Sequence, residues 1–145
     1  MAEDTQMGPL CTAGQLATIE REVAHAQTEG GRVLCGGKQP KGMGGTYYEP
    51  TIIDCPRQDL RIVDTELFGP VLSVLRFRTE AEVVELANDT QHGLAAGVFT
   101  RDGARQMRMA RALSAAQRND AEQWCPGVQP GALIDSPLNP VVCEV

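Results

Sequence analysis

The sequence predicts an α/β fold built on an open, largely parallel sheet with flanking helices. Three observations lead to this prediction. Residues 14–29 have the pattern of an amphipathic helix, and residues 71–75 form a nearly continuous apolar run. Between residues 69 and 115 the pattern alternates strand, helix, strand and helix, which indicates parallel strands joined by right-handed crossovers.

The first element is expected to be a helix over residues 14–29. Its apolar side chains recur at helical spacing, at Leu16, Ile19, Val23 and Ala26. Thr12 or Gly14 is expected to cap its start. Gly30–Gly31 is expected to end it, because glycine adopts the left-handed C-cap conformation without strain.

Extended segments are expected next. Residues 32–37 are typical of a short strand, and residues 38–48 of a glycine-rich loop. Residues 47–54 look extended, with Pro50 marking an edge or a break. The best strand pattern covers residues 69–77, and its apolar run is typical of a sheet covered on both faces.

The second half continues with a T-x-x-E capping pattern at Thr79 and Glu82, which predicts a helix over residues 80–89. A strand over residues 94–100 follows.

Asp102 is placed to cap a further helix over residues 103–115. One side of that helix is expected to carry Met107, Ala110 and Leu113. Another sheet strand should come next, but the sequence offers no good candidate. We therefore predict one domain over residues 1–115 and a weakly ordered tail over residues 116–145, which has no sustained period.

Composition and charge exclude several function classes. The net charge of −6 argues against nucleic-acid binding, which needs clustered Lys and Arg. No apolar run is long enough to predict a membrane span, and the first ten residues do not resemble a secretory signal. The cysteines are widely spaced without a C-x-x-C pair, so a zinc site has little support. Reduced thiols are expected, which favours the cytoplasm.

Four sequence blocks occur in series: MGPL at 7–10, YYEPTII at 47–53, TELFGPVLSV at 65–74 and ANDTQHGLAAGVFTRD at 87–102. Their order and spacing resemble the NAD(P)-dependent aldehyde dehydrogenase superfamily over about residues 4–115. The resemblance implies part of that family's catalytic domain, an open α/β sheet. It also implies oxidation of an aldehyde substrate to a carboxylic acid, with NAD or NADP as cofactor.

The third block is similar to the family motif E-E-[IL]-F-G-P, with Thr65 in place of the first acid and Glu66 as the second. The resemblance implies that Glu66 accepts hydrogen bonds from the hydroxyls of the nicotinamide-side ribose. It implies that Phe68 packs near the nicotinamide ring. A carboxylate suits a diol, because it offers two acceptor oxygens to two donors. Read without the resemblance, Glu66 is a solvated charge and Phe68 a core residue.

The family's reaction also needs a cysteine nucleophile, a general base and a Rossmann-type domain. The family's block with a Gly-Gln shortly before the nucleophile is absent, and no Rossmann-type phosphate-binding turn is expected. Cys35 and Cys55 are expected to be buried small hydrophobes, and Cys11 lies at a helix approach. The resemblance therefore implies a piece of an aldehyde dehydrogenase that is inactive alone. The alternative is a non-catalytic module that associates with a full-length relative through exposed sheet edges.

Overall fold

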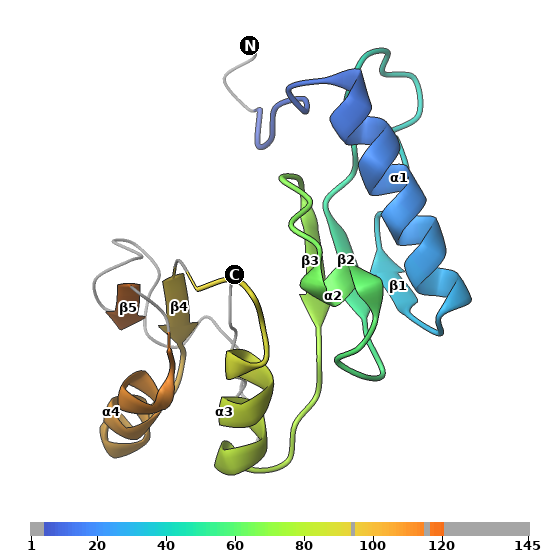
Figure 1. The fold of residues 1–145 in the computed structure, drawn as a ribbon. Helices are drawn as coiled ribbons and strands as arrows, with labels where there is room; N and C mark the ends of the chain where they lie inside the picture. The colour runs from blue at the N-terminus through green and yellow to red at the C-terminus, as the bar shows by residue number, and fades with distance from the viewer. Residues whose placement is uncertain (1–4, 94, 115–116, 121–145) are drawn as a thin grey trace. The chain divides into compact units, whose positions relative to one another are not determined.

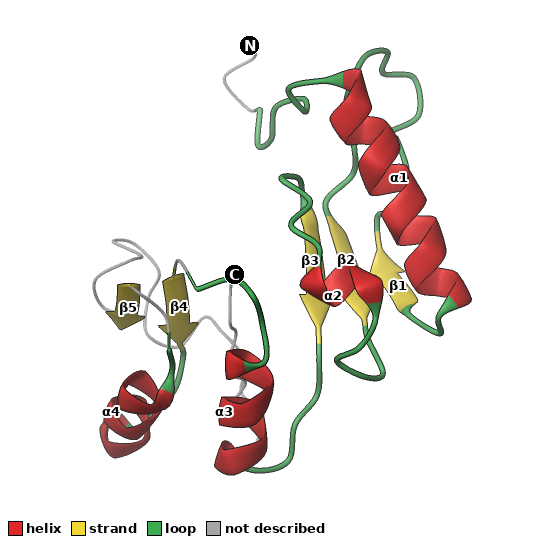
Figure 2. Ribbon diagram, in the orientation of Figure 1, coloured by secondary structure: helices red, strands yellow, loops and turns green. Residues whose placement is uncertain are grey.

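The computed structural model describes residues 5–93, 95–114 and 117–120. The chain forms two compact units, Met1–Arg76 and Phe77–Val145. Both combine helices with strands, which confirms the predicted α/β class (Figures 1 and 2). Within the described residues, no helix has the length and apolar character that crossing a membrane requires.

The first unit contains a three-stranded sheet in the order β1-β2-β3 with two helices. Its elements are α1 (Ala13–Thr28), β1 (Arg32–Cys35), β2 (Thr51–Asp54), α2 (Arg61–Asp64) and β3 (Val71–Val74). β2 and β3 are parallel, whereas β1 pairs antiparallel with β2. The sheet is therefore mixed rather than purely parallel. The strands predicted at residues 69–77 and 94–100, here β3 and β4 (Ala95–Val98), belong to different sheets and do not form the predicted parallel pair.

Both ends of α1 confirm the sequence analysis. The Thr12 hydroxyl accepts a hydrogen bond from the Gln15 amide at 3.1 Å, so Thr12 is the N-cap. At the other end Gly30 has φ +96°, a conformation that disfavours side chains with a Cβ. The Gly31 amide donates to the Ala26 carbonyl at 2.8 Å and closes the last turn.

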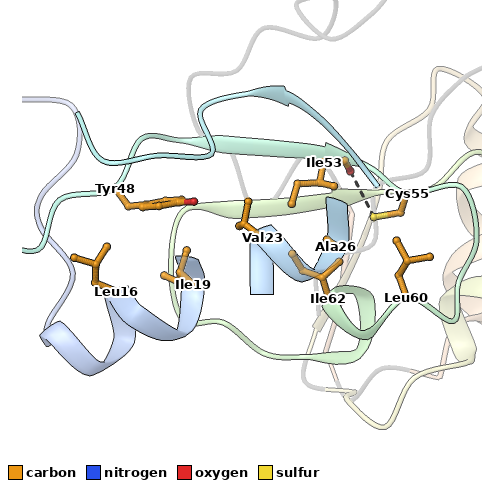
Figure 3. Close-up of a cluster of buried hydrophobic side chains, with 9 residues drawn as sticks. All are labelled: Leu16, Ile19, Val23, Ala26, Tyr48, Ile53, Cys55, Leu60 and Ile62. Atoms are coloured by element: carbon orange, nitrogen blue, oxygen red, sulfur yellow. Dashed lines mark hydrogen bonds between the residues drawn. The ribbon is translucent and has the colours of Figure 1, made fainter. Parts of the chain in front are cut away.

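The core of this unit lies between α1 and the sheet. Its buried side chains are Leu16, Ile19, Val23, Ala26, Tyr48, Ile53, Cys55, Leu60 and Ile62 (Figure 3). The four predicted apolar positions of α1 are all in this set. Burial is the main reason that the pKa of the Tyr48 hydroxyl is raised.

The strand β3 departs from its prediction. Its apolar run was expected to be covered on both faces, but Leu72 is 37% exposed and Val71 and Val74 are only half-buried. On β1, Leu34 is 51% exposed. The prediction of coverage on both faces is therefore wrong for the described residues, because α1 and α2 bury only the side chains that join the core.

A charged cluster ties the three strands together. The Asp54 carboxylate on β2 accepts from Arg32 on β1 at 3.0 Å and from Arg76, just after β3, at 2.8 Å. The hydrogen bond from Arg76, followed by the one from Arg32, lowers the pKa of Asp54. Asp54 is thus more readily ionised in the folded protein than in the unfolded chain.

This shift predicts a pH dependence. A depressed pKa contributes stability fully above the unfolded value, about 3.9 for Asp, and that stability is lost as pH falls through the folded value. Asp54→Asn should therefore lose less stability than the wild type between pH 7 and pH 3. Urea unfolding midpoints of both proteins at the two pH values measure this. Equal losses of stability in the two proteins would contradict a stabilising role for the Asp54 carboxylate.

The second unit contains α3 (Glu80–Asn88), β4 (Ala95–Val98), α4 (Gly103–Ala112) and β5 (Gln117–Asp120). β4 and β5 are parallel. Thr79 accepts from the Glu82 amide at 3.1 Å, and Asp102 accepts from the Ala104 amide at 2.9 Å. Both predicted N-caps are confirmed.

The buried side of α4 differs from the prediction. Met109 and Leu113 join Val83 and Val98 in the core of this unit, whereas Met107 is 53% exposed. Met109 and Leu113 are four residues apart and therefore share one side of the helix, which packs against Val83 and Val98. Arg105 and Arg108 both pair with Glu80 on α3, at 2.7 and 2.9 Å.

The strand β5 was not predicted, because the sequence offers no good strand candidate after the last helix. It begins at Gln117, two residues into the region predicted to be a tail. The rest of that predicted tail, residues 121–145, lies outside the described residues.

Candidate functional site

The candidate site is the segment between α2 and β3, residues 65–70, called the 65–70 loop below. Glu66 and Phe68 are exposed, with Phe68 at 71%, while Leu67 between them packs against the core. The side chains thus alternate outward, inward and outward. The alternative that Phe68 is a core residue is wrong, whereas the exposure of Glu66 fits either interpretation.

The backbone of Phe68 adopts a left-handed conformation with φ +49°. Non-glycine residues rarely do so, and the conformation costs about 1–2 kcal/mol for an L-residue. The Gln15 side chain on α1 donates a hydrogen bond to the Phe68 carbonyl and supports this conformation. Strained backbone of this kind is concentrated at functional sites, where the surrounding structure maintains it.

Gly69 permits the loop to approach α1 closely. A Cβ at this position would overlap Ile19 Cδ1 and would lie 3.2 Å from Leu10 Cδ2. Ile19 is fully buried. Any side chain at residue 69 would therefore force the Ile19 side chain to shift within the core.

Both ends of the loop are attached to regular structure. The Thr65 hydroxyl donates to the Arg61 carbonyl of α2 at 2.8 Å. The Pro70 carbonyl accepts from the Thr51 amide of β2, also at 2.8 Å. The loop is therefore fixed at both ends, and it exposes the side chains of Glu66 and Phe68.

These two side chains have complementary chemistry. The Glu66 carboxylate has no hydrogen-bond or ion-pair partner among the residues that the structure describes, so both its oxygens are available as acceptors. Phe68, two residues on, offers an apolar ring face. Together they could contact a ligand that carries both hydroxyl donors and a flat apolar ring.

The cysteines offer no clear nucleophile within the described residues. Cys55 is buried, as predicted, and burial raises the pKa of its thiol, which disfavours the reactive thiolate. Cys35 is exposed, so its predicted burial is wrong, and Cys11 is also exposed. Cys125 and Cys143 lie outside the described residues. No group of three potential metal ligands occurs in the described part of the chain.

Some of the loop's supports were not predicted. The four-residue helix α2 is too short to leave a periodic signal. Gln15 and Arg61 also appear in the site only through tertiary contacts. The one local signal was the Gly69-Pro70 dipeptide, which marks a turn.

The strain at Phe68 gives a testable prediction. Phe68→Gly is expected to raise the free energy of unfolding by about 1 kcal/mol, because glycine adopts positive φ without the steric cost. Phe68→Ala keeps a Cβ and should give no such gain. Urea unfolding of the two variants compares them directly, and equal stabilities would contradict the strain.

Known proteins match most of the chain. The aldehyde dehydrogenase family model matches residues 1–123. The chain is 49% identical over 120 residues to 4-trimethylaminobutyraldehyde dehydrogenase of Mus musculus, covering 79% of this chain and 24% of that protein. The family match also extends past residue 115, the predicted end of the resemblance, and includes β5.

Solved structures give the same result. A lactaldehyde dehydrogenase from Escherichia coli has a TM-score of 0.75 at 38% identity, with 81% of this chain and 24% of that chain covered. An indole-3-acetaldehyde dehydrogenase in complex with NAD+ has a TM-score of 0.76 at 43% identity, with the same coverage. The chain thus spans about a quarter of the length of the proteins that it matches.

Proposed function

Since the chain belongs to the aldehyde dehydrogenase family, we propose that it supplies the nicotinamide-ribose loop for NAD(P)-dependent oxidation of an aldehyde to a carboxylic acid. The observation that carries this proposal is the 65–70 loop, which holds an unpaired Glu66 and an exposed, strained Phe68 outward. Support also comes from a similar solved structure that contains NAD+.

In this proposal Glu66 accepts hydrogen bonds from the two ribose hydroxyls, and Phe68 forms a wall beside the nicotinamide ring. Hydrogen bonds to a charged acceptor contribute about 1.5–3 kcal/mol. The nicotinamide, when bound, supplies a hydride acceptor. The contribution of this chain is orientation, since a fixed loop holds the ring in one position and lowers the entropic cost of reaching reactive geometry.

The chemical steps need a nucleophile and a general base. We place both in segments of the family's enzymes outside the matched residues 1–123. The 145-residue chain by itself is therefore expected to form no NADH when incubated with NAD and aldehydes.

A chimera tests the proposal. Residues 1–123 would replace the matching segment of the Mus musculus relative, which is 49% identical. We expect the chimera to form NADH from NAD and the aldehyde for which that relative is named. The unmodified relative is the positive control, and circular dichroism verifies folding. A folded chimera that forms no NADH, or turnover by the isolated chain, would refute the proposal.

A second candidate function is association with a full-length relative. It is favoured by Leu34 and Leu72, which are exposed on the two outer strands of the three-stranded sheet. Exposed apolar side chains on outer strands promote pairing with another chain. Cross-linking with the Mus musculus relative should give a heteromeric product that Leu34→Lys abolishes. Absence of the product would remove this candidate.

A further inference from the structure

We propose that one face of α1, called the splint, holds α2 and the 65–70 loop in position through direct contacts. Glu22 is its central positioning residue. The inference rests on the proposed function for the purpose of the loop, but the splint itself is a property of the ligand-free chain. Three α1 residues and its C-cap residue form this face, at intervals of three, four or seven positions: Gln15, Ile19, Glu22 and the C-cap Glu29. Such spacing places them along one side of the helix.

Glu22 is the first reason for the proposal. Its side chain is only 2% exposed, and its Oε1 accepts from Arg61 Nη2 at 2.9 Å and from Arg21 Nε at 3.1 Å. Its Oε2 is buried without a hydrogen-bond partner among the described residues. A buried carboxylate that is only half satisfied is costly, and an apolar residue of similar size commonly serves stability as well or better. We infer that Glu22 orients Arg61.

Glu29, the C-cap residue of α1, also contacts Arg61. The N-cap of α2 is Leu60, which makes no side-chain capping hydrogen bond. Instead, the Arg61 amide donates to Glu29 Oε2 at 3.3 Å. A residue at the end of α1, distant in the sequence, therefore provides the acceptor that a capping side chain usually provides locally.

Arg61 connects this support to the loop. Its amide contacts Glu29, its guanidinium contacts Glu22, and its carbonyl accepts from the Thr65 hydroxyl at 2.8 Å. Thr65 immediately precedes Glu66 in the chain. Fixing Arg61 from α1 therefore fixes the direction in which the chain enters the loop.

The other end of the same α1 face holds the end of the loop. Gln15 donates to the Phe68 carbonyl, and Ile19 occupies the space that a side chain at residue 69 would need. The residues that enter and leave the loop are thus fixed by one rigid helix. The left-handed backbone at Phe68 is the feature that this support maintains.

The test uses the full 145-residue chain without ligand and compares Glu22→Gln with Glu20→Gln. Glu20 is an exposed carboxylate on the same helix that accepts only from Gln39 among the described contacts. Two readouts are recorded by NMR: amide hydrogen exchange, and the Cα and Cβ chemical shifts of Phe68, which report its left-handed backbone. Neither needs cofactor or turnover.

Glu22→Gln is expected to raise amide exchange at Arg61 and Val63 about tenfold, as expected for a weakened hydrogen bond to a charged group. It should also move the Phe68 shifts toward those of an unstructured chain. Exchange at Cys55, whose amide bonds the Val74 carbonyl, should stay unchanged. Gln15→Ala, which removes the support of the Phe68 carbonyl, is expected to move the same Phe68 shifts.

Two results would overturn the splint. Glu22→Gln could behave as Glu20→Gln does, or it could raise exchange equally throughout the first unit while the Phe68 shifts stay in place. The second result would show a purely structural role. Failure of the cofactor proposal would look different. The effects of Glu22→Gln on amide exchange and on the Phe68 chemical shifts would remain, while Glu66→Gln would bind NADH as tightly as its parent.

Discussion

Replacing Ile19 by alanine is expected to lower the free energy of unfolding of the first unit by about 2–5 kcal/mol, the range for such truncations in a core. Ile19 is fully buried, and it lies among the side chains that join α1 to the sheet (Figure 3). The truncation removes apolar contacts and leaves a cavity. Because domains are stable by only about 5–15 kcal/mol, this is a large share of the total. Urea unfolding followed by circular dichroism measures it.

Leu72→Ala provides the control for this prediction. Leu72 is an apolar residue on β3 that is already 37% exposed, so its truncation should cost clearly less than that of Ile19. Equal costs for the two variants would contradict the location of the core. The comparison also bears on the loop, because Ile19 is the side chain that Gly69 approaches.

The sequence predicted the features that depend on a few neighbouring residues. The caps at Thr12, Thr79 and Asp102 were found because a short polar side chain bonds to amides two or three residues ahead. The apolar face of α1 was found because its spacing is regular over four turns.

Features that depend on distant partners were missed or misplaced. Met109 rather than Met107 is buried, since the side of α4 that faces the core depends on packing against Val83 and Val98 in other elements. β5 has the polar sequence Gln117–Asp120 and becomes a strand by pairing with β4. Strand propensity depends strongly on such context.

The candidate site shows the same division. Glu66 and Phe68 were selected by resemblance to a family motif, because a lone glutamate in a loop gives no signal of its own. The positive φ of Phe68 could not be predicted from its neighbours. It accompanies contacts with Gln15 and Ile19, which lie about fifty residues earlier in the chain.

Glu66→Gln is expected to weaken NADH binding by about tenfold or more in the chimera that carries residues 1–123. The substitution removes the charge and replaces one acceptor oxygen by a donor, so a ribose diol loses charge-assisted hydrogen bonds of about 1.5–3 kcal/mol. A difference of about 1.4 kcal/mol corresponds to a tenfold change in the dissociation constant. Glu85→Gln is the matched control, since Glu85 is an exposed carboxylate on α3 outside the loop.

The dissociation constant of NADH for the chimera and these two variants, measured by fluorescence titration, tests most directly whether Glu66 binds the ribose. The account predicts a tenfold or greater increase for Glu66→Gln and no change for Glu85→Gln. Equal dissociation constants for Glu66→Gln and its parent, in proteins that unfold at the same temperature, would contradict it.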